Sequence, residues 1–587
     1  MKYKIKSNRL KDVIVIAFFA LLAYMYIVIL FKSGKIFPAA DRLFHIERFE
    51  EEFKIFQSGH LVSMISTFSF SKVGQAINVY YPWGNLIPYG IIRSIVNKPV
   101  TAYYFYIGLE QFLGLLIAYF SANKISKSRK LAFVFAIVLR FSAYVLFNDF
   151  PRFDVGEAWA LIFIPLTLAG FYNLVIKNSY LIGSGCMALG LTAELYCHIL
   201  TSLITVVTLI VLYVISFLFQ SHKVKILFSL ICSVIIFLVL TSGFIIPLIF
   251  SMFQNKVIAP VIGLDESFNG YLAKSKSLSQ VVNLSLNNHI SGLEPNIGLV
   301  LLVTVFLGIV VFNQSTNLEK TIYLIGTSSL LLGTTLLPWM FNSKQLIQIV
   351  QFPWRLFTIS IVFLAYFTAS KVSKKNISSI SVILVALYCG LTSIDSIKYI
   401  QNNGPVESIS SQNYPRPYTL DNKSYEKVLT LNNNSASDVR YLDYLPNNAK
   451  ISSSDAFNHK TKLGNQILFL NKNQIIPGYQ SETFKIPKHR GKSGIAVLPF
   501  YIYDVDHYIL YVDGKKTNFK VNKGSLLTFQ FKTNNKLTAT VKYQTPVIYI
   551  VARYVSLGGI IILLVIYFII KYRSHRKTYL VNKVHSL

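Results

Sequence analysis

Long apolar runs recur along most of this 587-residue chain, and they restrict its fold more than any other feature. About 20 consecutive apolar residues are enough for one helix to cross the hydrocarbon layer of a bilayer. With 53% hydrophobic and 14% charged residues, the chain is too apolar for a soluble protein of its length. The sequence therefore predicts a polytopic α-helical membrane protein with about 12 transmembrane helices. We expect spans near residues 13–31, 101–122, 131–147, 157–176, 180–198, 200–219, 224–247, 297–313, 320–338, 356–370, 377–396 and 547–570.

The distribution of Lys and Arg predicts which side of the membrane each loop faces. The formal net charge is +31 at pH 7, but the basic residues cluster in short stretches between the apolar runs. The stretches "KISKSRK", "QSHKVK", "KVSKKN" and "KYRSHRK" all fall on one side when the spans alternate, as the positive-inside rule requires of cytoplasmic loops. We therefore expect a multi-pass protein of the plasma membrane with both termini in the cytoplasm and no nucleic-acid partner.

Shifts in composition divide the chain into domains. Residues 1–396 are expected to form a transmembrane module in which 32–100 is the first outer loop. Residues 397–546 are rich in Asn, Ser, Lys and Tyr, and the later part alternates apolar with polar residues, with hairpin signals at Asp513-Gly514 and Asn534-Asn535. This segment predicts an extracytoplasmic β-rich, sandwich-like domain before the last helix. Residues 547–587 predict a final transmembrane helix and a basic cytoplasmic tail.

The stretch Asp41–Phe56, "DRLFHIERFEEEFKIF", directly follows the first apolar run and its short connection. Residues three and four apart share a face of a helix, so two stripes lie side by side on it. One stripe is charged and contains Asp41, His45, Arg48 and Glu52; the other is apolar and contains Ile46, Phe49, Phe53 and Phe56. We expect this helix to lie at the membrane surface, with its apolar stripe in lipid and its charged stripe toward the protein. An interfacial helix with a solvated charged face is the alternative.

Three further sites at the outer ends of spans carry ionisable residues, which inside a membrane usually face a cavity or a partner. They are Asp149, Arg152, Asp154 and Glu157 in "NDFPRFDVGEAW", Glu194 and His198 one helical turn apart, and Arg355 in "QFPWRLF". Each site also has a structural interpretation: a helix N-cap for Asp154, an intramembrane ion pair for Glu194 and a snorkelling anchor for Arg355. Their position on one side of the membrane favours a functional site.

An aromatic stretch in the first outer loop is a further candidate. Residues 79–90, "VYYPWGNLIPYG", include Tyr81 and Trp83 together with two prolines and two glycines. This composition suits a loop that dips into the membrane interface or stacks on a sugar. An ordinary aromatic belt at the interface has the same composition, so both interpretations stay open.

Several motifs together carry a resemblance. An Asp after the first span with "FHIER", then "RFDVGEAWALIFIPLTLAG", "LYCHILTS", "QFPWRLF" and "YLDYLP" before a β-rich end, resembles bacterial multi-spanning proteins labelled 6-pyruvoyl-tetrahydropterin synthase-related. These are related to teichoic-acid-glycosylating membrane proteins of Gram-positive bacteria, in the C-type glycosyltransferase (GT-C) superfamily. The resemblance covers most of the chain in order and spacing. The pterin chemistry finds no support, because the sequence has no HxH-type zinc cluster.

The resemblance implies a GT-C-like fold and an inverting, polyprenyl-phosphate-sugar-dependent glycosyltransferase. Such an enzyme moves a sugar to a cell-envelope acceptor, teichoic acid or wall polysaccharide, on the outer face of the membrane. An acidic residue of the first outer loop then acts as base or orients the acceptor hydroxyl, and Asp41 matches that position. The departing phosphate needs a cation, for which Arg355 is the first choice and Arg48 and Arg152 are alternatives.

The other candidate residues are expected to shape the acceptor pocket: His45, Asp154, Glu157, Glu194, His198, Tyr81 and Trp83. Asp41 and Asp154 with a nearby His would suit Mg²⁺ or Mn²⁺. Members of the superfamily differ in metal dependence, so this point stays open. Besides the lipid-linked donor and the envelope acceptor, the expected partners are membrane lipids, a donor synthase and a flippase.

Two other classes of function are alternatives. A transporter or flippase for lipid-linked saccharides would place charged residues or broken helices at mid-membrane, with access from both sides. In this chain the ionisable candidates lie mostly toward the outer edge. A non-catalytic envelope scaffold that presents the β-rich domain would leave the charged stripe and Arg355 without a role.

Overall fold

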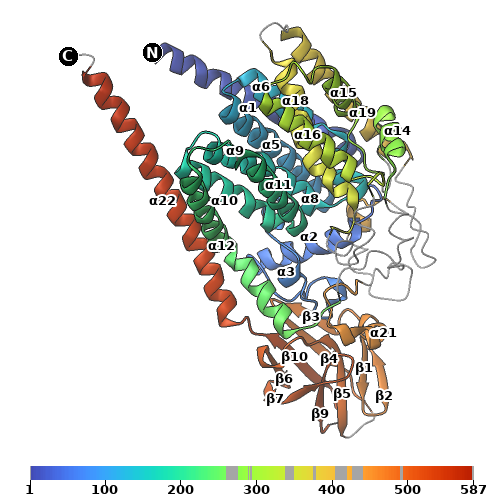
Figure 1. The fold of residues 1–587 in the computed structure, drawn as a ribbon. Coiled ribbons are helices and arrows are strands. Elements are labelled where there is room, and N and C mark those ends of the chain that lie inside the picture. The colour runs from blue at the N-terminus through green and yellow to red at the C-terminus, as the bar shows by residue number, and fades with distance from the viewer. Residues whose placement is uncertain are drawn as a thin grey trace.

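The computed structural model describes residues 2–217, 219–258, 275–288, 290, 294–337, 350–374, 379–403, 419–425, 441–489, 493–533 and 535–584. Figure 1 shows a helical part and a β-rich part, with the N- and C-termini at the end of the helical part farthest from the strands. This arrangement agrees with the expected alternation of spans, because both termini lie on one side and the β-rich part lies on the other. Which side is cytoplasmic stays a prediction.

The helical part is that of a multi-pass membrane protein. Nine helical segments of the described residues are long and apolar enough to cross a membrane: Leu10–Ser33, Pro99–Ser126, Arg129–Arg152, Val155–Val175, Ile199–Phe217, Lys223–Gln254, Pro353–Val372, Ile383–Asn402 and Val547–Ile569. The spans expected near 180–198, 297–313 and 320–338 correspond to three helices that are not among these nine. Residue 338, at the end of the last of these, lies outside the described residues.

The helices of this part are α1 (Lys2–Ser33), α5 (Pro99–Ser126), α6 (Arg129–Arg140), α7 (Ala143–Phe147), α8 (Val155–Leu161), α9 (Ile164–Val175), α10 (Tyr180–Cys197), α11 (Ile199–Phe217), α12 (Lys223–Gln254), α15 (Leu299–Val310), α16 (Asn317–Leu332), α18 (Phe357–Val372), α19 (Ser379–Asn403) and α22 (Val547–Val584). Shorter elements are α2 (Arg42–Gln57), α3 (Ile77–Tyr80), α4 (Leu86–Ile95), α14 (Leu278–Asn287), α21 (Ser453–Phe457), the 3₁₀ turns η1 (Phe70–Lys72), η3 (Pro353–Leu356), η4 (Asn447–Ile451) and η5 (Val505–His507), and the π turn η2 (Asn148–Arg152).

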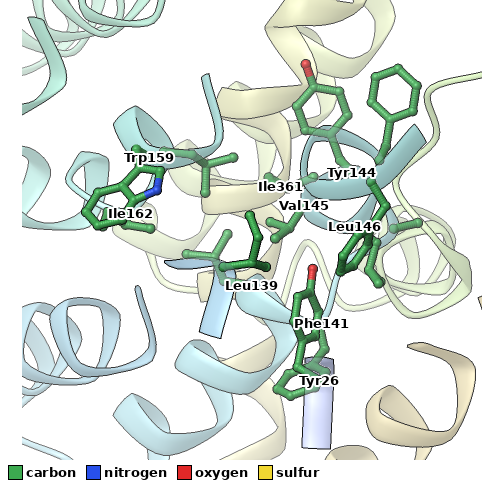
Figure 2. Close-up of a cluster of buried hydrophobic side chains, with 14 of the residues drawn as sticks. Tyr26, Leu139, Phe141, Tyr144, Val145, Leu146, Trp159, Ile162 and Ile361 are labelled. Atoms are coloured by element: carbon green, nitrogen blue, oxygen red, sulfur yellow. The ribbon is translucent and has the colours of Figure 1, made fainter. Parts of the chain in front are cut away.

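The chain between α6 and α9 is a broken helix rather than a continuous span. The chain kinks after Arg140, continues as α7 and widens into the π turn η2, which contains Pro151. Proline lacks the N–H that a regular helix needs, and π turns often occur at functional sites. Figure 2 shows the buried core around this break, where the side chains of Tyr26, Phe141 and Tyr144 lie among aliphatic residues. The packing holds the irregular backbone in place.

Helix α2 forms where the sequence predicts it, but most of both stripes is buried, and only Asp41 and Phe56 at their ends are partly exposed. Phe49 is 1% exposed and stacks on Tyr89 of α4, with ring centroids 4.2 Å apart. Glu51 accepts three backbone N–H bonds from residues 67–69. The expectation of an apolar stripe in lipid is therefore wrong, and so is that of a solvated charged face, because the rest of the outer loop folds over the helix.

The β-rich part is a sandwich of two five-stranded antiparallel sheets, with strand orders β2-β1-β5-β9-β8 and β3-β4-β10-β6-β7. The strands are β1 (Lys460–Leu463), β2 (Gln466–Phe469), β3 (Ile475–Gly478), β4 (Ser481–Ile486), β5 (Gly494–Tyr501), β6 (Tyr508–Val512), β7 (Lys515–Thr517), β8 (Phe519–Val521), β9 (Leu526–Phe531) and β10 (Leu537–Tyr543). Asp513 and Gly514 have positive φ and join β6 to β7, so this predicted hairpin is confirmed. The second turn signal includes Asn534, which lies outside the described residues.

The first outer loop joins the two parts. Val62, Met64, Ile65 and Val79 of the loop belong to the same buried cluster as the inner faces of the strands. Met64 also donates its backbone N–H to the side chain of Gln480, at 2.8 Å. The loop is thus packed between the sandwich and the transmembrane helices, and α2 with its charged residues lies at this junction (Figure 1).

Candidate active site

Backbone pairing places Asp41 against the broken helix. After α1 the chain runs back along η2, where Ala40 and Asp41 donate N–H bonds of 3.0 Å to the carbonyls of Pro151 and Arg152. These carbonyls are available because the helix ends here: Phe153 has a φ of 59°, which a regular helix does not allow. Asp41 is therefore held beside Arg152 by the main chain as well as by its own charge.

Five charged side chains form one row, which we call the site cluster: Asp41, Arg152, Asp154, Arg355 and Glu157. Arg152 lies between two carboxylates, with Nε 3.0 Å from Asp41 Oδ2 and Nη2 3.7 Å from Asp154 Oδ2. Arg355 lies between the carboxylates of Asp154 and Glu157, with Nη2 3.8 Å from Asp154 Oδ2 and Nε 3.3 Å from Glu157 Oε2. The structure thus brings together, as alternating acids and arginines, five residues that the sequence singled out.

Exposure distinguishes Asp41 from the rest of the row. Its side chain is 39% exposed, whereas the side chains of the other four members are 1–6% exposed. Charges so far from water are stable only when they are paired, as these are. Desolvation raises the pKa of Asp41, and the guanidinium of Arg152 opposes this rise without cancelling it. Asp41 is therefore the member that a reactant can approach, and a raised pKa makes a carboxylate a better base.

Hydrogen bonds fix the other end of the row. Glu157 Oε1 accepts from the hydroxyls of Tyr144, at 2.5 Å, and Thr358, at 3.0 Å. Asp154 caps α8 by accepting the backbone N–H of Glu157 at 3.1 Å, so its expected N-cap role is confirmed alongside its pairing with the arginines. Arg355 also donates to the side chain of Gln351 at 2.7 Å. The idea of a snorkelling anchor at Arg355 is wrong, because an anchor would reach water.

Two histidines adjoin the row at Asp154. Burial opposes ionisation of Asp154, but His198, Arg152, Arg355 and His45 together hold the pKa of this carboxyl below its ordinary value. For His45, burial and the nearby cation of Arg48 lower the pKa to about 3, so its ring is neutral at pH 7. His198 Nδ1 lies 2.8 Å from the hydroxyl of Thr201.

Tyr81 and Arg48 form an aromatic and cationic wall beside the row. The Arg48 guanidinium lies 4.2 Å from the centre of the Tyr81 ring and donates to the carbonyl of Pro82. In the described part of the chain, Arg48 Nε and Nη1 have no hydrogen-bond acceptor and no carboxylate lies within ion-pair distance. Tyr81 reaches the row over Gly156, where a Cβ would lie 2.9 Å from its hydroxyl and 3.4 Å from Asp154 Oδ1. Only a glycine at 156 leaves this space.

Two other candidates, Glu194 and Trp83, lie apart from the row. Glu194 accepts a hydrogen bond from Thr167 of α9, and the ion pair considered for it does not form among the described residues. Trp83 packs edge-to-face on Tyr196, with ring centroids 5.4 Å apart. Helical spacing puts Glu194 and His198 on one face, but α10 ends at Cys197 and the backbone of His198 is extended, which turns its side chain away.

A second group of buried charges, which we call the sealed cluster, contains Tyr26, Glu110, Gln111, Arg140 and Asp149. Arg140 Nη2 lies 2.6 Å from Glu110 Oε1, and Arg140 Nε donates to Gln111 at 2.8 Å. Tyr26 donates its hydroxyl to Asp149 at 2.5 Å. Asp149 was predicted to belong to the candidate site, whereas Glu110 and Arg140 were not predicted as functional or paired residues. Their signal was a lone charge inside each of two apolar runs, which in a membrane demands a partner.

An arginine separates the two candidate metal ligands Asp41 and Asp154. Arg152 lies between Asp41 and Asp154, where a shared cation would have to bind. Among the described residues, no group of three or more His, Cys, Asp or Glu side chains could hold a metal ion.

No protein-family model and no curated protein sequence matches the chain. Among solved structures, it is similar to the arabinofuranosyltransferase AftD from Mycobacteria, with 12% identity and a TM-score of 0.41 over 66% of this chain. The chain spans only 26% of AftD. ArnT from Cupriavidus metallidurans, bound to undecaprenyl phosphate, is 11% identical with a TM-score of 0.37, over 71% of this chain and 68% of ArnT. The oligosaccharyltransferase of Archaeoglobus fulgidus is 11% identical with a TM-score of 0.33, and the match covers 73% of this chain and 60% of that protein. Similarities this low establish neither the family nor the activity of this chain.

Proposed function

We propose that the chain is a GT-C-type glycosyltransferase, which moves a sugar from a polyprenyl-phosphate-linked donor to a cell-envelope acceptor on the outer face of the membrane. Teichoic acid or a wall polysaccharide is the proposed acceptor. The observation that carries the proposal is the site cluster, in which one partly exposed carboxylate stands at the head of a buried row of paired charges. Asp41 lies eight residues after the end of α1, and we expect a lipid-linked phosphate to meet the protein at this level.

Asp41 is the proposed base. Its Oδ2 is held by Arg152, which leaves Oδ1 to accept the proton of the acceptor hydroxyl. The hydroxyl oxygen then bonds to the anomeric carbon from the side opposite the phosphate, and the bond from that carbon to the phosphate oxygen breaks. Polyprenyl phosphate leaves with the electron pair, and the configuration at the anomeric carbon inverts.

The phosphate requires a cation with unused hydrogen-bond donors. Arg355, the first choice from the sequence, shares its guanidinium with Asp154 and Glu157 and also donates to Gln351. Arg48 has two N–H groups that lack an acceptor in the described part of the chain, and buried donors without acceptors are rare in native proteins. This favours Arg48 as the phosphate ligand, with Arg355 orienting the carboxylates of the row.

A transfer assay tests this function directly. Purified protein in lipid vesicles is given radiolabelled polyprenyl-phosphate sugar and an envelope-polymer extract. Two quantities are measured: the label incorporated into the polymer and the label translocated across the vesicle membrane. The proposal expects label in the polymer. Label that crosses the vesicle membrane without entering the polymer would identify a transporter. Neither incorporation nor translocation of label would identify a scaffold. Either result contradicts the proposal.

A further inference from the structure

A large apolar pocket lies among the transmembrane helices, away from the site cluster. Its volume is about 580 Å³, within the range of about 300–1,000 Å³ usual for ligand pockets. Its lining comes from α5, α6, α9, α11, α16, α18 and the adjoining loops, and includes Phe135, Leu168, Phe171, Leu212 and Phe363. Such a lining suits a hydrocarbon chain and offers little to a sugar.

The pocket lies toward the opposite membrane surface from the row. Leu212 is 13 residues beyond Ile199 on α11, which at 1.5 Å per residue is about 20 Å from the end that adjoins His198. Likewise, Tyr366 lines the pocket from the far half of α18, whose near end follows Arg355. The pocket therefore opens near the surface that carries the basic loops "KISKSRK" and "QSHKVK".

Two lysines lie over aromatic rings of this pocket. Lys320 is the one charged side chain among its described lining residues, and its Nζ lies 5.4 Å from the ring centre of Phe312. Lys177 follows the lining residue Ile176, and its Nζ lies 5.6 Å from the ring centre of Tyr172. Both Phe312 and Tyr172 line the pocket, so cationic groups and an apolar interior adjoin one another.

We infer that the pocket binds an acyl chain of an anionic phospholipid from the membrane leaflet opposite the site cluster, with Lys320 and Lys177 binding the lipid phosphate. The apolar lining accounts for the chain, and the lysines supply charge complementary to the headgroup. A zwitterionic phospholipid also carries a phosphate, but its choline cation would be repelled by the two ammonium groups, whereas an anionic headgroup has no such cation. This inference concerns a site separate from Asp41 and does not depend on the proposed transferase activity.

The test uses full-length protein purified from vesicles of phosphatidylcholine mixed with phosphatidylglycerol, and native mass spectrometry counts the lipid that survives detergent exchange. Wild type should retain phosphatidylglycerol about fivefold over phosphatidylcholine, as expected from about one lysine's attraction to an anionic lipid. Lys320→Gln should lose most of this preference, whereas Lys225→Gln, an equal change of charge at an exposed position on α12, should keep it.

Filling the pocket should expel the lipid. Leu212→Trp places a large ring in the pocket, and Leu227→Trp places the same ring at a half-exposed position outside it. If Leu212→Trp does not fold, Ser216→Phe at another lining position replaces it. Retention equal to wild type in a folded pocket variant would overturn the site. Equal retention of both lipids by wild type would overturn the anionic headgroup, and a bound protein in place of lipid would overturn the ligand class.

Discussion

The site cluster and the sealed cluster both bury paired charges, but they differ in their access to solvent. In the sealed cluster, the side chains of Arg140 and Glu110 are both 0% exposed and pair at 2.6 Å. In the site cluster the pairing is similar, but the Asp41 side chain is 39% exposed. A sealed pair can only stabilise the fold, since no reactant reaches it. The comparison teaches that access, rather than burial or pairing alone, separates a candidate catalytic acid from a structural one.

The largest expected effect is that of Asp41→Asn on the transfer rate. The amide keeps the shape of the side chain but does not accept the proton, so the rate should fall by about 10²–10⁴-fold. The loss of stability should be smaller than the loss of about 3–5 kcal/mol expected for breaking a fully buried pair, because Asp41 is partly exposed and Arg152 keeps Asp154 as a partner. Transfer assays at matched amounts of folded protein measure this loss. Asp506→Asn, at an exposed position of η5, is the control and should leave the rate unchanged.

Breaking the sealed cluster should lower stability strongly and leave the transfer rate almost unchanged. Glu110→Ala leaves Arg140 buried without its carboxylate partner and should lower the free energy of unfolding by about 3–5 kcal/mol. Denaturant unfolding in detergent measures this change, and the transfer rate per folded molecule should stay near wild type. Asp12→Ala breaks the half-exposed pair with Arg129 and should cost about 0–1 kcal/mol. A folded Glu110→Ala protein without activity would remove the distinction between the two clusters.

A smaller effect is expected where α5 makes room for the sealed cluster. A Cβ at Gly114 would lie 2.5 Å from Arg140 Nε, so Gly114→Ala should overpack this region and cost about 1–3 kcal/mol of stability. Gly185→Ala on α10 is the matched control, because a Cβ there has nothing within 4 Å and alanine favours the helix. Thermal unfolding of both variants checks the difference. Equal stability would mean that Arg140 moves easily and that the cluster is loosely packed.

The smallest expected effect concerns the phosphate. Arg48→Lys keeps the charge but loses the planar fork, so KM for the donor should rise about tenfold with little change in kcat. Arg355→Lys should instead lower kcat, because it disturbs the carboxylates that Arg355 holds. Initial rates at varied donor concentration separate the two. If Arg355→Lys instead raised KM for the donor and Arg48→Lys lowered kcat, Arg355 rather than Arg48 would be the phosphate ligand.

The sequence predicted the class, the helices, the β-sandwich and the members of the row, because apolar length, strand alternation and lone charges are local signals. It did not predict the environment of α2, since an apolar stripe such as that of Phe49 suits protein and lipid equally well. Nor did it predict that the segment at Asp41 pairs with the backbone of η2, because that pairing depends on a broken helix more than 100 residues away.

The sequence also could not predict which charged residues belong to the site cluster and which to the sealed cluster. Asp149 and Asp154 lie five residues apart in one motif, yet the turn through Pro151 and Phe153 sends Asp149 to Tyr26 and Asp154 to Arg152. Hydroxyl partners such as Tyr144 carry no local signal, since most tyrosines in such a chain only pack. Partner choice of this kind is decided by tertiary structure.

One measurement tests the role of Asp41 most directly: the single-turnover transfer rate of Asp41→Asn, determined together with its equilibrium binding of the donor. The account predicts that donor binding stays within about twofold of wild type while the single-turnover rate falls by about 10²–10⁴-fold, because only the proton acceptor has been removed. A single-turnover rate near that of wild type, or a loss of rate that donor binding fully explains, would contradict the assignment of Asp41 as the base.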